Sequence, residues 1–479
     1  MVAEHLTIRN VTSTPIRLKR IERFRAPERS FEGVQTFARN FTRVLTNVTR
    51  ATTPVAAIHD DTTPFTHNEA DFEIAPFQTV HTEIRAFLDS KKERLRWIFE
   101  VEGEEHQLQT PVPTTESATM KAMSDDPKFR LTGVFITPES HLTIFSSAHL
   151  EAWMRELDGD VLLSSLSIPG THNSPTCHVA APSVRCQAVS PREQLRNGVR
   201  FFDIRVQPQY PDDADRDELI LVHSVFPISL TGSKYFRDLM REVEEFLSEN
   251  PSEAVIISLK REGPGNHTDE QLSRILSDHY TSAEGSRWYT EPKIPTLGEV
   301  RGKVVLLRRF NIQDSLKELH DGHGWGIDAS GWADNCADAT CPSGQLCIQD
   351  FYEVLLTQNI DQKIQYVRDQ CQRAGGTVYP FGVLPDSSAT RDHPFYINFL
   401  SASNFWKVGT WPEKIAAKVN PATVDYLCRR HGSGEDGDWS TGILVTDWVG
   451  LDGDWDLVRC IVGMNARVRE RRLAQVDDW

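Results

Sequence analysis

Six segments of this sequence share one pattern, in which apolar residues alternate along a strand-like run that ends on a polar or ionisable side chain. Residues two apart lie on the same face of a strand. In the run 199–206, Val199 and Phe201 are followed on one face by Asp203 and Arg205. An inward-facing charge is costly to bury unless it is paired. Because six strands show the same pattern, we interpret their polar ends as parts of one functional site and not as charges that merely face solvent.

Eight strand-like runs alternate with longer helical stretches from about residue 150 onward. They span residues 161–168, 199–206, 219–223, 254–259, 304–307, 346–350, 395–400 and 442–447. This order predicts a TIM-like (β/α)8 barrel, whose functional residues lie at the carboxyl ends of the strands. The other polar ends of the pattern are His223, Lys260 with Glu262, Arg309, Asp350 with Tyr352, and Asp447.

Residues 1–148 follow a different pattern, with short segments of period-two alternation separated by turns rich in Thr, Pro, Asp and Asn. The segments are 6–9, 16–21, 94–101 and 129–136. This pattern predicts an all-β, sandwich-like domain ahead of a barrel domain at 149–479. Nothing in it suggests catalysis, so we expect a docking or stabilising module, with membrane or lipid recognition as the alternative.

The net charge of −16 over 479 residues argues against nucleic acid as a partner, because phosphate binding needs a basic face. It also argues against broad attraction to anionic membranes, so contact with a lipid surface should use apolar loops. No apolar stretch reaches the length of a membrane span. The N-terminus lacks the features of a signal peptide. We therefore expect a cytoplasmic or non-classically secreted protein.

Eight cysteines leave the redox state open. Cys336, Cys341 and Cys347 crowd one loop, and Cys177 and Cys186 flank another, which would suit either loop disulfides or free thiols. Their spacings match no zinc signature.

Two histidines with supporting carboxylates and arginines suit in-line displacement at phosphorus. One imidazole takes a proton from the attacking hydroxyl and the other gives a proton to the leaving oxygen. A guanidinium stabilises the charge that develops on the phosphoryl oxygens. His172 and His223 are the candidates, whereas His320 and His323 lie in a Gly-rich stretch and are expected to be structural or exposed.

Several motifs resemble, in the same order, the bacterial-type phosphatidylinositol-specific phospholipase C family over about residues 150–465. The matching segments are 153–154, 163–174, 194–195, 198–205, 222–223, 258–262, 301–310, 331–335, 349–352 and 443–448. The resemblance implies a barrel enzyme that acts on phosphatidylinositol or a related inositol lipid.

The resemblance also implies roles for the two histidines. His172, held by Asp447, would be the general base that deprotonates the inositol 2-hydroxyl. His223, supported by Asp203, would be the general acid that protonates the diacylglycerol oxygen. The products would be inositol 1,2-cyclic phosphate and diacylglycerol.

Arg205 bears on the question of a metal cofactor. In the calcium-dependent branch of the family a carboxylate stands at this position, so a guanidinium here implies a metal-independent enzyme with no cofactor. Asn173 is a departure, because the bacterial-type enzymes carry Asp there. The resemblance further implies that Lys260, Arg309, Asp350 and Tyr352 line the inositol pocket, that Glu262 orients Lys260, and that Trp332 lies at its rim.

Other interpretations stay open at this point. The barrel could act on glycosyl-phosphatidylinositol anchors or another glycerophosphodiester, or it could be a non-catalytic lipid-binding module. The segment 175–189 replaces the family's interfacial helix with a loop containing Cys, Pro and Ala, so membrane contact could differ or pass to the N-terminal domain.

Overall fold

The computed structural model describes most of the barrel region and the strands of the N-terminal region. The described residues are 5–25, 58–59, 62–86, 93–112, 115–137, 139–146, 149–181, 183–282, 285–356, 358–384, 391–404, 406–433 and 437–477. The predicted boundary at residue 148 lies outside them.

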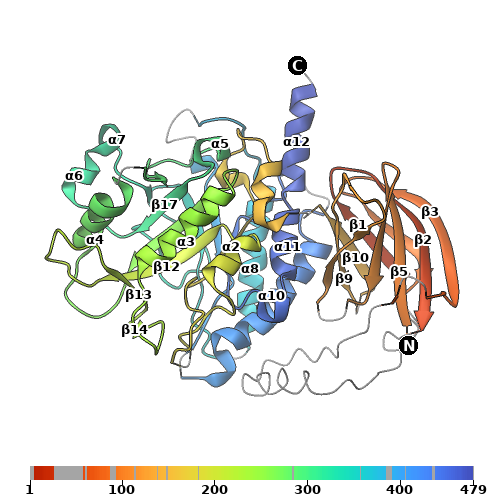
Figure 1. Cartoon of the computed structure of the whole chain (residues 1–479), viewed down its shortest axis with the longest axis horizontal. Helices are drawn as coiled ribbons and strands as arrows, with labels where there is room; N and C mark the ends of the chain where they lie inside the picture. Colours follow the sequence, from red (N-terminus) through yellow and green to blue (C-terminus); the bar gives the residue numbers. More distant parts are fainter. Residues whose placement is uncertain are drawn as a thin grey trace.

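The N-terminal region is built from strands that form two five-stranded sheets (Figure 1). The first sheet has the order β4-β1-β10-β9-β7 and the second β3-β2-β5-β6-β8. The strands are β1 His5–Val11, β2 Ile16–Arg25, β3 Thr66–Ile74, β4 Thr79–Arg85, β5 Glu93–Val101, β6 Glu104–Thr110, β7 Ser117–Thr119, β8 Lys121–Ala122, β9 Thr132–Ile136 and β10 His141–Phe145. Alternate residues of both sheets, such as Ile8, Trp97 and Leu142, are buried in one apolar cluster. Three of the four predicted segments lie within β1, β2 and β5, and the fourth, 129–136, is a strand only from Thr132 onward.

The second region is a curved, mainly parallel sheet. Its hydrogen-bonded order is β16-β17-β15-β12-β11-β22-β21-β20-β19, with β18 beside β17 and the hairpin β13-β14 beside β12. The strands are β11 Ile168–Thr171, β12 Phe201–Pro208, β13 Leu219–His223, β14 Phe226–Pro227, β15 Val255–Arg261, β16 Trp288–Tyr289, β17 Val304–Arg309, β18 Ile327–Asp328, β19 Ala339–Thr340, β20 Leu346–Gln349, β21 Phe395–Phe399 and β22 Ile443–Thr446. Within the described residues β18 and β20 are not paired, so the barrel is TIM-like but open.

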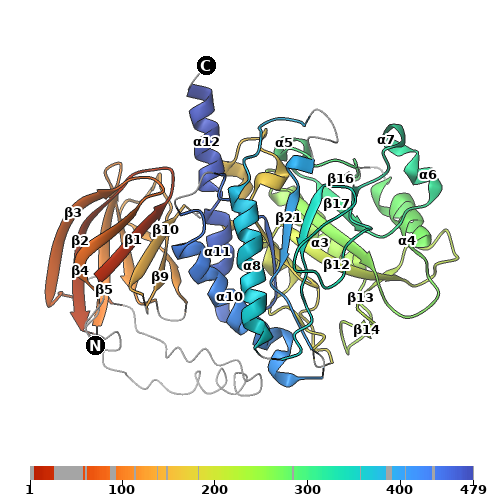
Figure 2. The ribbon, with the colours of Figure 1, turned by 180° about the vertical axis from the view of Figure 1, so that it is seen from behind.

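Most helices lie on the outside of this sheet, whereas α12 extends away from it (Figure 2). They are α2 Pro191–Arg196, α3 Phe236–Glu249, α4 Asp269–Leu276, α5 Leu297–Val300, α6 Asp314–Lys317, α7 Leu319–Gly322, α8 Asn359–Gly376, α10 Pro412–Arg429, α11 Asp456–Gly463 and α12 Ala466–Asp477, with short 3-10 or π turns at Leu150–Glu156, Leu163–Ser165, Ser277–Thr281, Val408–Thr410 and Leu451–Gly453. Helix α3 buries Leu239, Val243 and Phe246 at helical spacing and ends before Pro251, which cannot continue it.

Two sequence expectations about the barrel strands are wrong. The run 161–168 is a 3-10 turn with isolated bridges, and strand β11 begins only at Ile168. Strand β13 pairs antiparallel with β12 as a hairpin arm and is not a barrel strand. Four two-residue strands, β14, β16, β18 and β19, were not predicted, because two residues carry too little periodicity to be recognised. Among the described residues, β18 and β20 are joined by β19 and loops rather than by a helix.

Arg9 links the first sheet to the barrel region. Its side chain is buried, and its guanidinium donates to the carbonyl oxygens of Leu427 (3.3 Å), Cys428 (3.0 Å) and His431 (2.7 Å) at the end of α10. A cation at a helix C-terminus is favoured by the helix dipole and satisfies carbonyls that have no helical partner. Asp456 forms a second link, because its carboxylate accepts from the backbone N–H groups of Glu116 (2.7 Å) and Ser117 (3.1 Å).

All eight cysteines are described, and all are free thiols. Loop disulfides, which the sequence had left open, are therefore not formed. None of the helices described is both long enough and apolar enough to span a bilayer.

Candidate active site

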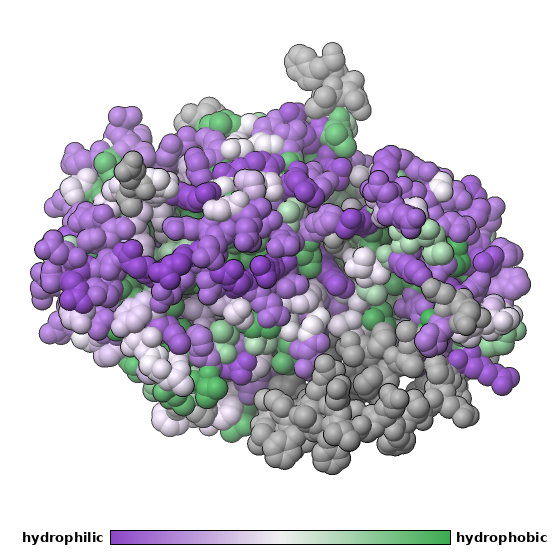
Figure 3. Space-filling model, viewed as in Figure 1, coloured by the Kyte–Doolittle hydropathy of each residue, from purple (hydrophilic) through white to green (hydrophobic). Residues whose placement is uncertain are grey.

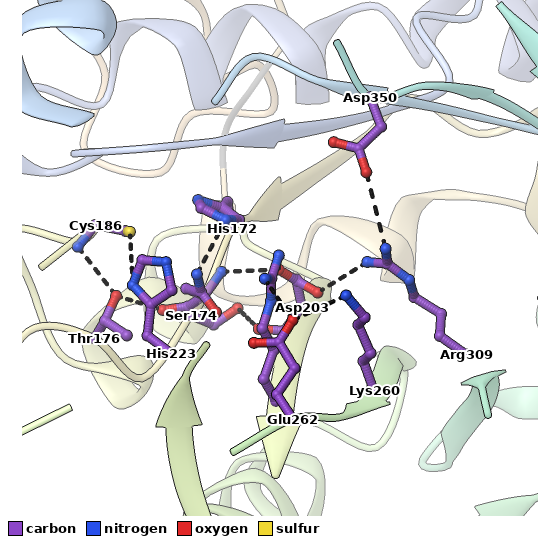
Figure 4. A network of polar contacts seen from close by, with 12 residues as sticks. His172, Ser174, Thr176, Cys186, Asp203, His223, Lys260, Glu262, Arg309 and Asp350 are labelled. Atoms are coloured by element: carbon purple, nitrogen blue, oxygen red, sulfur yellow. Dashed lines mark hydrogen bonds and ion pairs between the residues drawn. The ribbon is translucent and has the colours of Figure 1, made fainter. Parts of the chain in front are cut away.

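Polar side chains from the carboxyl ends of the barrel strands meet at one mouth (Figure 4). His172 follows β11, Asp203 and Arg205 lie on β12, and Lys260 lies on β15. Contacts with these groups bring the predicted strand-end residues to the same mouth, namely Glu262, Arg309, Asp350 and Asp447. The structure thus brings these predicted strand-end residues together.

His172 and Asp447 form the predicted pair. His172 Nδ1 lies 2.9 Å from Asp447 Oδ1, and because a carboxylate can only accept, Nδ1 carries the proton. Burial lowers the pKa of His172, but Asp447 and the Cys186 thiol outweigh it and raise that pKa to about 10. These two groups favour the imidazolium, whereas Asn173 Nδ2, 3.0 Å from His172 Nε2, can donate only to the neutral ring.

His223 is held differently from the expectation. Its Nδ1 lies 2.8 Å from the Val184 carbonyl oxygen and 4.0 Å from Cys186 Sγ. Asp203 is engaged elsewhere, accepting from the Asn173 backbone N–H at 3.1 Å. The predicted pairing of His223 with Asp203 is wrong, because His223 comes from the β13 hairpin arm and not from a barrel strand. The two imidazole rings nevertheless face each other edge to face, with centroids 6.0 Å apart.

Two guanidinium groups surround Asp203 at the floor of the site. Arg205 Nη2 lies 3.3 Å and Arg309 Nη1 3.5 Å from its carboxylate oxygens. Burial raises the pKa of Asp203, but Arg205 and Arg309 outweigh it and lower that pKa to about 2. Asp203 is thus a permanent anion that fixes both arginines.

Glu262 connects the opposite side of the floor. Its Oε1 accepts from Arg205 Nη1 and Lys260 Nζ, both at 2.9 Å, and its Oε2 accepts from the Ser224 N–H at 2.8 Å. Burial alone raises the pKa of Glu262, yet Arg205 and Lys260 lower it to about 2. The expectation that Glu262 orients Lys260 agrees with these contacts.

Among the remaining predicted pocket residues, Trp332 contacts both Arg309 and Asp350, while Tyr352 has a separate partner. The Arg309 guanidinium lies 3.8 Å over the Trp332 ring centroid, and Trp332 Nε1 donates to Asp350 Oδ2 at 2.9 Å. Tyr352 is tied to Asp334 by its hydroxyl, at 2.9 Å. Strand alternation predicted that Arg309, and not Arg308, faces the site. Arg308 instead donates to the Trp325 carbonyl oxygen.

Left-handed backbone follows three of the site residues. Asn173 (φ 42°), Ser224 (φ 55°) and Trp448 (φ 54°) come directly after His172, His223 and Asp447. Such a conformation is unfavourable for a bulky side chain and is concentrated at functional sites. The backbone therefore turns sharply directly after His172, His223 and Asp447.

Buried polar atoms without a hydrogen-bond partner gather at this mouth. Among the described residues they include Arg205 Nε, Arg309 Nε and Nη1, Asn173 Oδ1, Ser258 Oγ and Asp447 Oδ2. Buried polar groups are nearly always paired, so such a concentration indicates a polar ligand. The unpartnered guanidinium N–H groups suit an anion.

Cys186 belongs to the site and sequence reasoning missed it. It is fully buried, and its sulfur lies near both histidines (Figure 4). It lies in a loop, where strand parity gives no signal. His320 and His323 are exposed, as expected.

Comparison with known proteins agrees with this site. Residues 161–310 match the family model for the phosphatidylinositol-specific phospholipase C X domain. A 1-phosphatidylinositol phosphodiesterase of Staphylococcus aureus (strain Newman) is 26% identical over 345 residues, which cover 68% of this chain and 97% of that protein. One from Listeria monocytogenes is 33% identical over 183 residues, covering 36% of this chain and 53% of that protein.

Solved structures show the same fold. A point mutant of the S. aureus phosphatidylinositol-specific phospholipase C superposes with a TM-score of 0.53 at 24% identity, over 67% of this chain and 97% of that one. Residues 161–310 thus match the phosphatidylinositol-specific phospholipase C X-domain family, and the fold of the barrel region agrees with that match.

Proposed function

We propose that this chain is a phosphatidylinositol-specific phospholipase C that needs no metal. The observation that carries the proposal is the meeting of two facing imidazoles with buried, unpartnered guanidinium N–H groups at one mouth. The staphylococcal and listerial relatives are 1-phosphatidylinositol phosphodiesterases, which supports the same substrate.

The reaction is an attack by the substrate's own hydroxyl. Neutral His172 takes the proton of the inositol 2-hydroxyl, and the oxygen bonds to phosphorus. The bond from phosphorus to the diacylglycerol oxygen breaks, and His223 gives that oxygen a proton. An intramolecular nucleophile avoids the entropy cost of fixing a water molecule. The product is inositol 1,2-cyclic phosphate, which the same histidines can open with water.

Arginines supply the electrostatic stabilisation in this mechanism. Arg205 and Arg309 face the mouth with N–H groups that lack partners, so a phosphodiester can accept from them as charge develops. Lys260, Asp350, Tyr352 and Trp332 are then available for the inositol ring, with Asn173 beside the base. Since Arg205 occupies the floor, a calcium ion would meet a positive charge.

Protonation of His172 sets the pH dependence. The imidazolium that Asp447 and Cys186 favour must lose its proton before it can act as a base. Turnover should therefore rise with pH across the neutral range.

Membrane contact is proposed for apolar loops at the same end of the barrel. Val179, Val225 and Leu230 are 71%, 58% and 65% exposed, and the Leu230 N–H donates to the Val179 carbonyl at 3.0 Å. Hydrophobic residues gather along the lower edge of Figure 3, where Figure 1 has β13 and β14. Trp406 (89% exposed) and Leu355 (65%) come from the loops after β21 and β20.

Vesicle binding tests this surface. Leu230→Ser and Trp406→Ala should each weaken co-sedimentation with phosphatidylcholine vesicles containing phosphatidylinositol. Leu473→Ser, an equally apolar change at an exposed position of α12, should not. If all three variants bound the vesicles equally well, these loops would not be the membrane contact.

For residues 1–148 we propose a stabilising domain on the barrel. The buried contacts of Arg9 and of Asp456 support this role. A domain of this kind affects unfolding and leaves vesicle binding unchanged.

Release of diacylglycerol from vesicles in the presence of EDTA tests the enzymatic proposal. The folded chain should cleave phosphatidylinositol under these conditions and should fail on the 2-deoxy analogue, which lacks the attacking hydroxyl. Cleavage of the 2-deoxy lipid at an equal rate would exclude the intramolecular mechanism.

A further inference from the structure

The Cys186 thiol lies inside the site, although the proposed reaction does not use it. The loop that carries it is fixed by backbone contacts: the Cys186 N–H donates to Thr176 Oγ1 at 3.1 Å, and its carbonyl accepts from the Trp448 N–H at 2.8 Å. The sulfur is directed at the two histidines (Figure 4). Its position is thus set by the fold.

Cys186 completes a set of metal-ligating groups. One ring nitrogen of His172, the sulfur of Cys186 and one carboxylate oxygen of Asp447 all lie within 4.8 Å of one another. Asp447 is only 2% exposed, and its Oδ2 has no hydrogen-bond partner among the described residues. A buried carboxylate oxygen without a partner beside a thiol and an imidazole is a donor left available.

We propose that His172, Cys186 and Asp447 bind Zn²⁺, with His223 available as a fourth ligand, and that the bound ion blocks the site. Nitrogen, sulfur and carboxylate oxygen are the ligands of zinc, whereas calcium takes six to eight oxygens. Bonds of about 2.0–2.3 Å put tetrahedral zinc ligands about 3.5 Å apart, so the three groups need to close by only about 1 Å.

Surrounding contacts hold the ligands in place, as metal sites require. Gln187 Nε2 donates to the His172 carbonyl at 2.7 Å, and Asn420 Nδ2 donates to the Asp447 carbonyl at 2.9 Å. His223 lies on the fourth side, with its Nδ1 4.0 Å from the sulfur. It would exchange its contact with the Val184 carbonyl for the ion.

Inhibition by zinc rests on the proposed function, but zinc binding does not. A metal-bound His172 has no lone pair with which to take the proton of the inositol hydroxyl. Zinc is therefore an inhibitor of this chain and not its cofactor, in contrast to a catalytic metal.

Cobalt substitution tests binding in the full-length, lipid-free protein. Co²⁺ should give the near-ultraviolet thiolate-to-metal absorption of a cysteine ligand at one equivalent. Cys186→Ala should lose this band, and Cys177→Ser, a change in the same loop outside the donor set, should keep it. Absence of the band in the parent chain, or an equal band in Cys186→Ala, would overturn the site.

Activity separates the two proposals. In EDTA the parent chain should cleave phosphatidylinositol, and free Zn²⁺ should inhibit it. Cys186→Ala should need more than about 100-fold more zinc for equal inhibition, because loss of even an outer-shell partner costs roughly 10- to 100-fold in affinity. No cleavage in EDTA together with an intact cobalt band would refute the enzymatic proposal alone. If zinc bound without inhibiting cleavage, it could not be bound to His172 as proposed.

If the variants do not fold, the site can still be tested by a measurement on the unmutated protein. Zinc should slow alkylation of Cys186 by iodoacetamide, read by peptide mass spectrometry, and leave that of Cys177 unchanged. Equal protection of both thiols, or of neither, would contradict the site.

Discussion

Asp447 Oδ1 lies 2.9 Å from His172 Nδ1 although the two residues are 275 positions apart in the chain. Their strands, β11 and β22, are parallel neighbours with Thr171 opposite Thr446, so the residues that follow both strands emerge side by side. Barrel topology, and not local sequence, makes this pair.

Removal of either imidazole should abolish most of the turnover. His172→Ala and His223→Ala should each lower kcat by about 10²- to 10⁴-fold, the usual contribution of a general acid or base. The assay is release of inositol phosphate from mixed micelles. The exposed His320 provides the control, and a similar loss in His320→Ala would mean that the site has been misassigned.

Arg205 should contribute through geometry as well as charge. Arg205→Lys keeps a cation but loses the fork that bridges Asp203 and Glu262, so kcat should fall by about 10²- to 10³-fold with little change in KM. Arg261→Lys is the matched control on the neighbouring strand, because Arg261 pairs with Asp269 instead. Equal kinetics of the two variants would count against the role of Arg205.

Arg9 should matter for stability and not for chemistry. Arg9→Met leaves three carbonyl oxygens without their donor and should lower the free energy of unfolding by about 2–4 kcal/mol, as measured in urea. Arg17→Met removes an exposed ion pair with Asp71 and should change the free energy of unfolding far less than Arg9→Met does. Vesicle binding should be the same for both variants.

Acid should weaken the contact between the first sheet and the barrel. Burial, with the charge of Arg9, lowers the pKa of His141 and of His431 to about 4. Both residues titrate near 6.5 once unfolded, so the unfolded chain binds protons first as the pH falls. Their contribution is complete above about pH 6.5 and is lost as the pH falls toward about 4, on the order of 3 kcal/mol for each residue.

A thermal-unfolding series over this pH range checks the sign. His431→Gln can still donate to the carbonyls of Trp439 and Ser440 and should flatten the decline of Tm, whereas His320→Gln should leave it unchanged. A Tm that rises on acidification would contradict the assignment.

Strand parity could predict Asp203, Arg205, Lys260 and Arg309, because alternation along a strand is written in the sequence. The apolar periods likewise predicted four N-terminal strands. Neither signal could reveal that β13 is an antiparallel arm, since an isolated strand carries no record of its partner. The pairing of His223 with Asp203 was implied by the family resemblance, and a resemblance of motifs does not fix which side chains touch. Cys186 was missed because a loop has no periodicity and its neighbours are set by tertiary contacts.

Phosphorus NMR of phosphatidylinositol incubated with the chain in EDTA tests the central claim most directly. The account predicts that the resonance of inositol 1,2-cyclic phosphate appears first, without added metal, and declines later as water opens the ring. Formation of inositol 1-phosphate with no cyclic intermediate, or an absolute requirement for calcium, would contradict it.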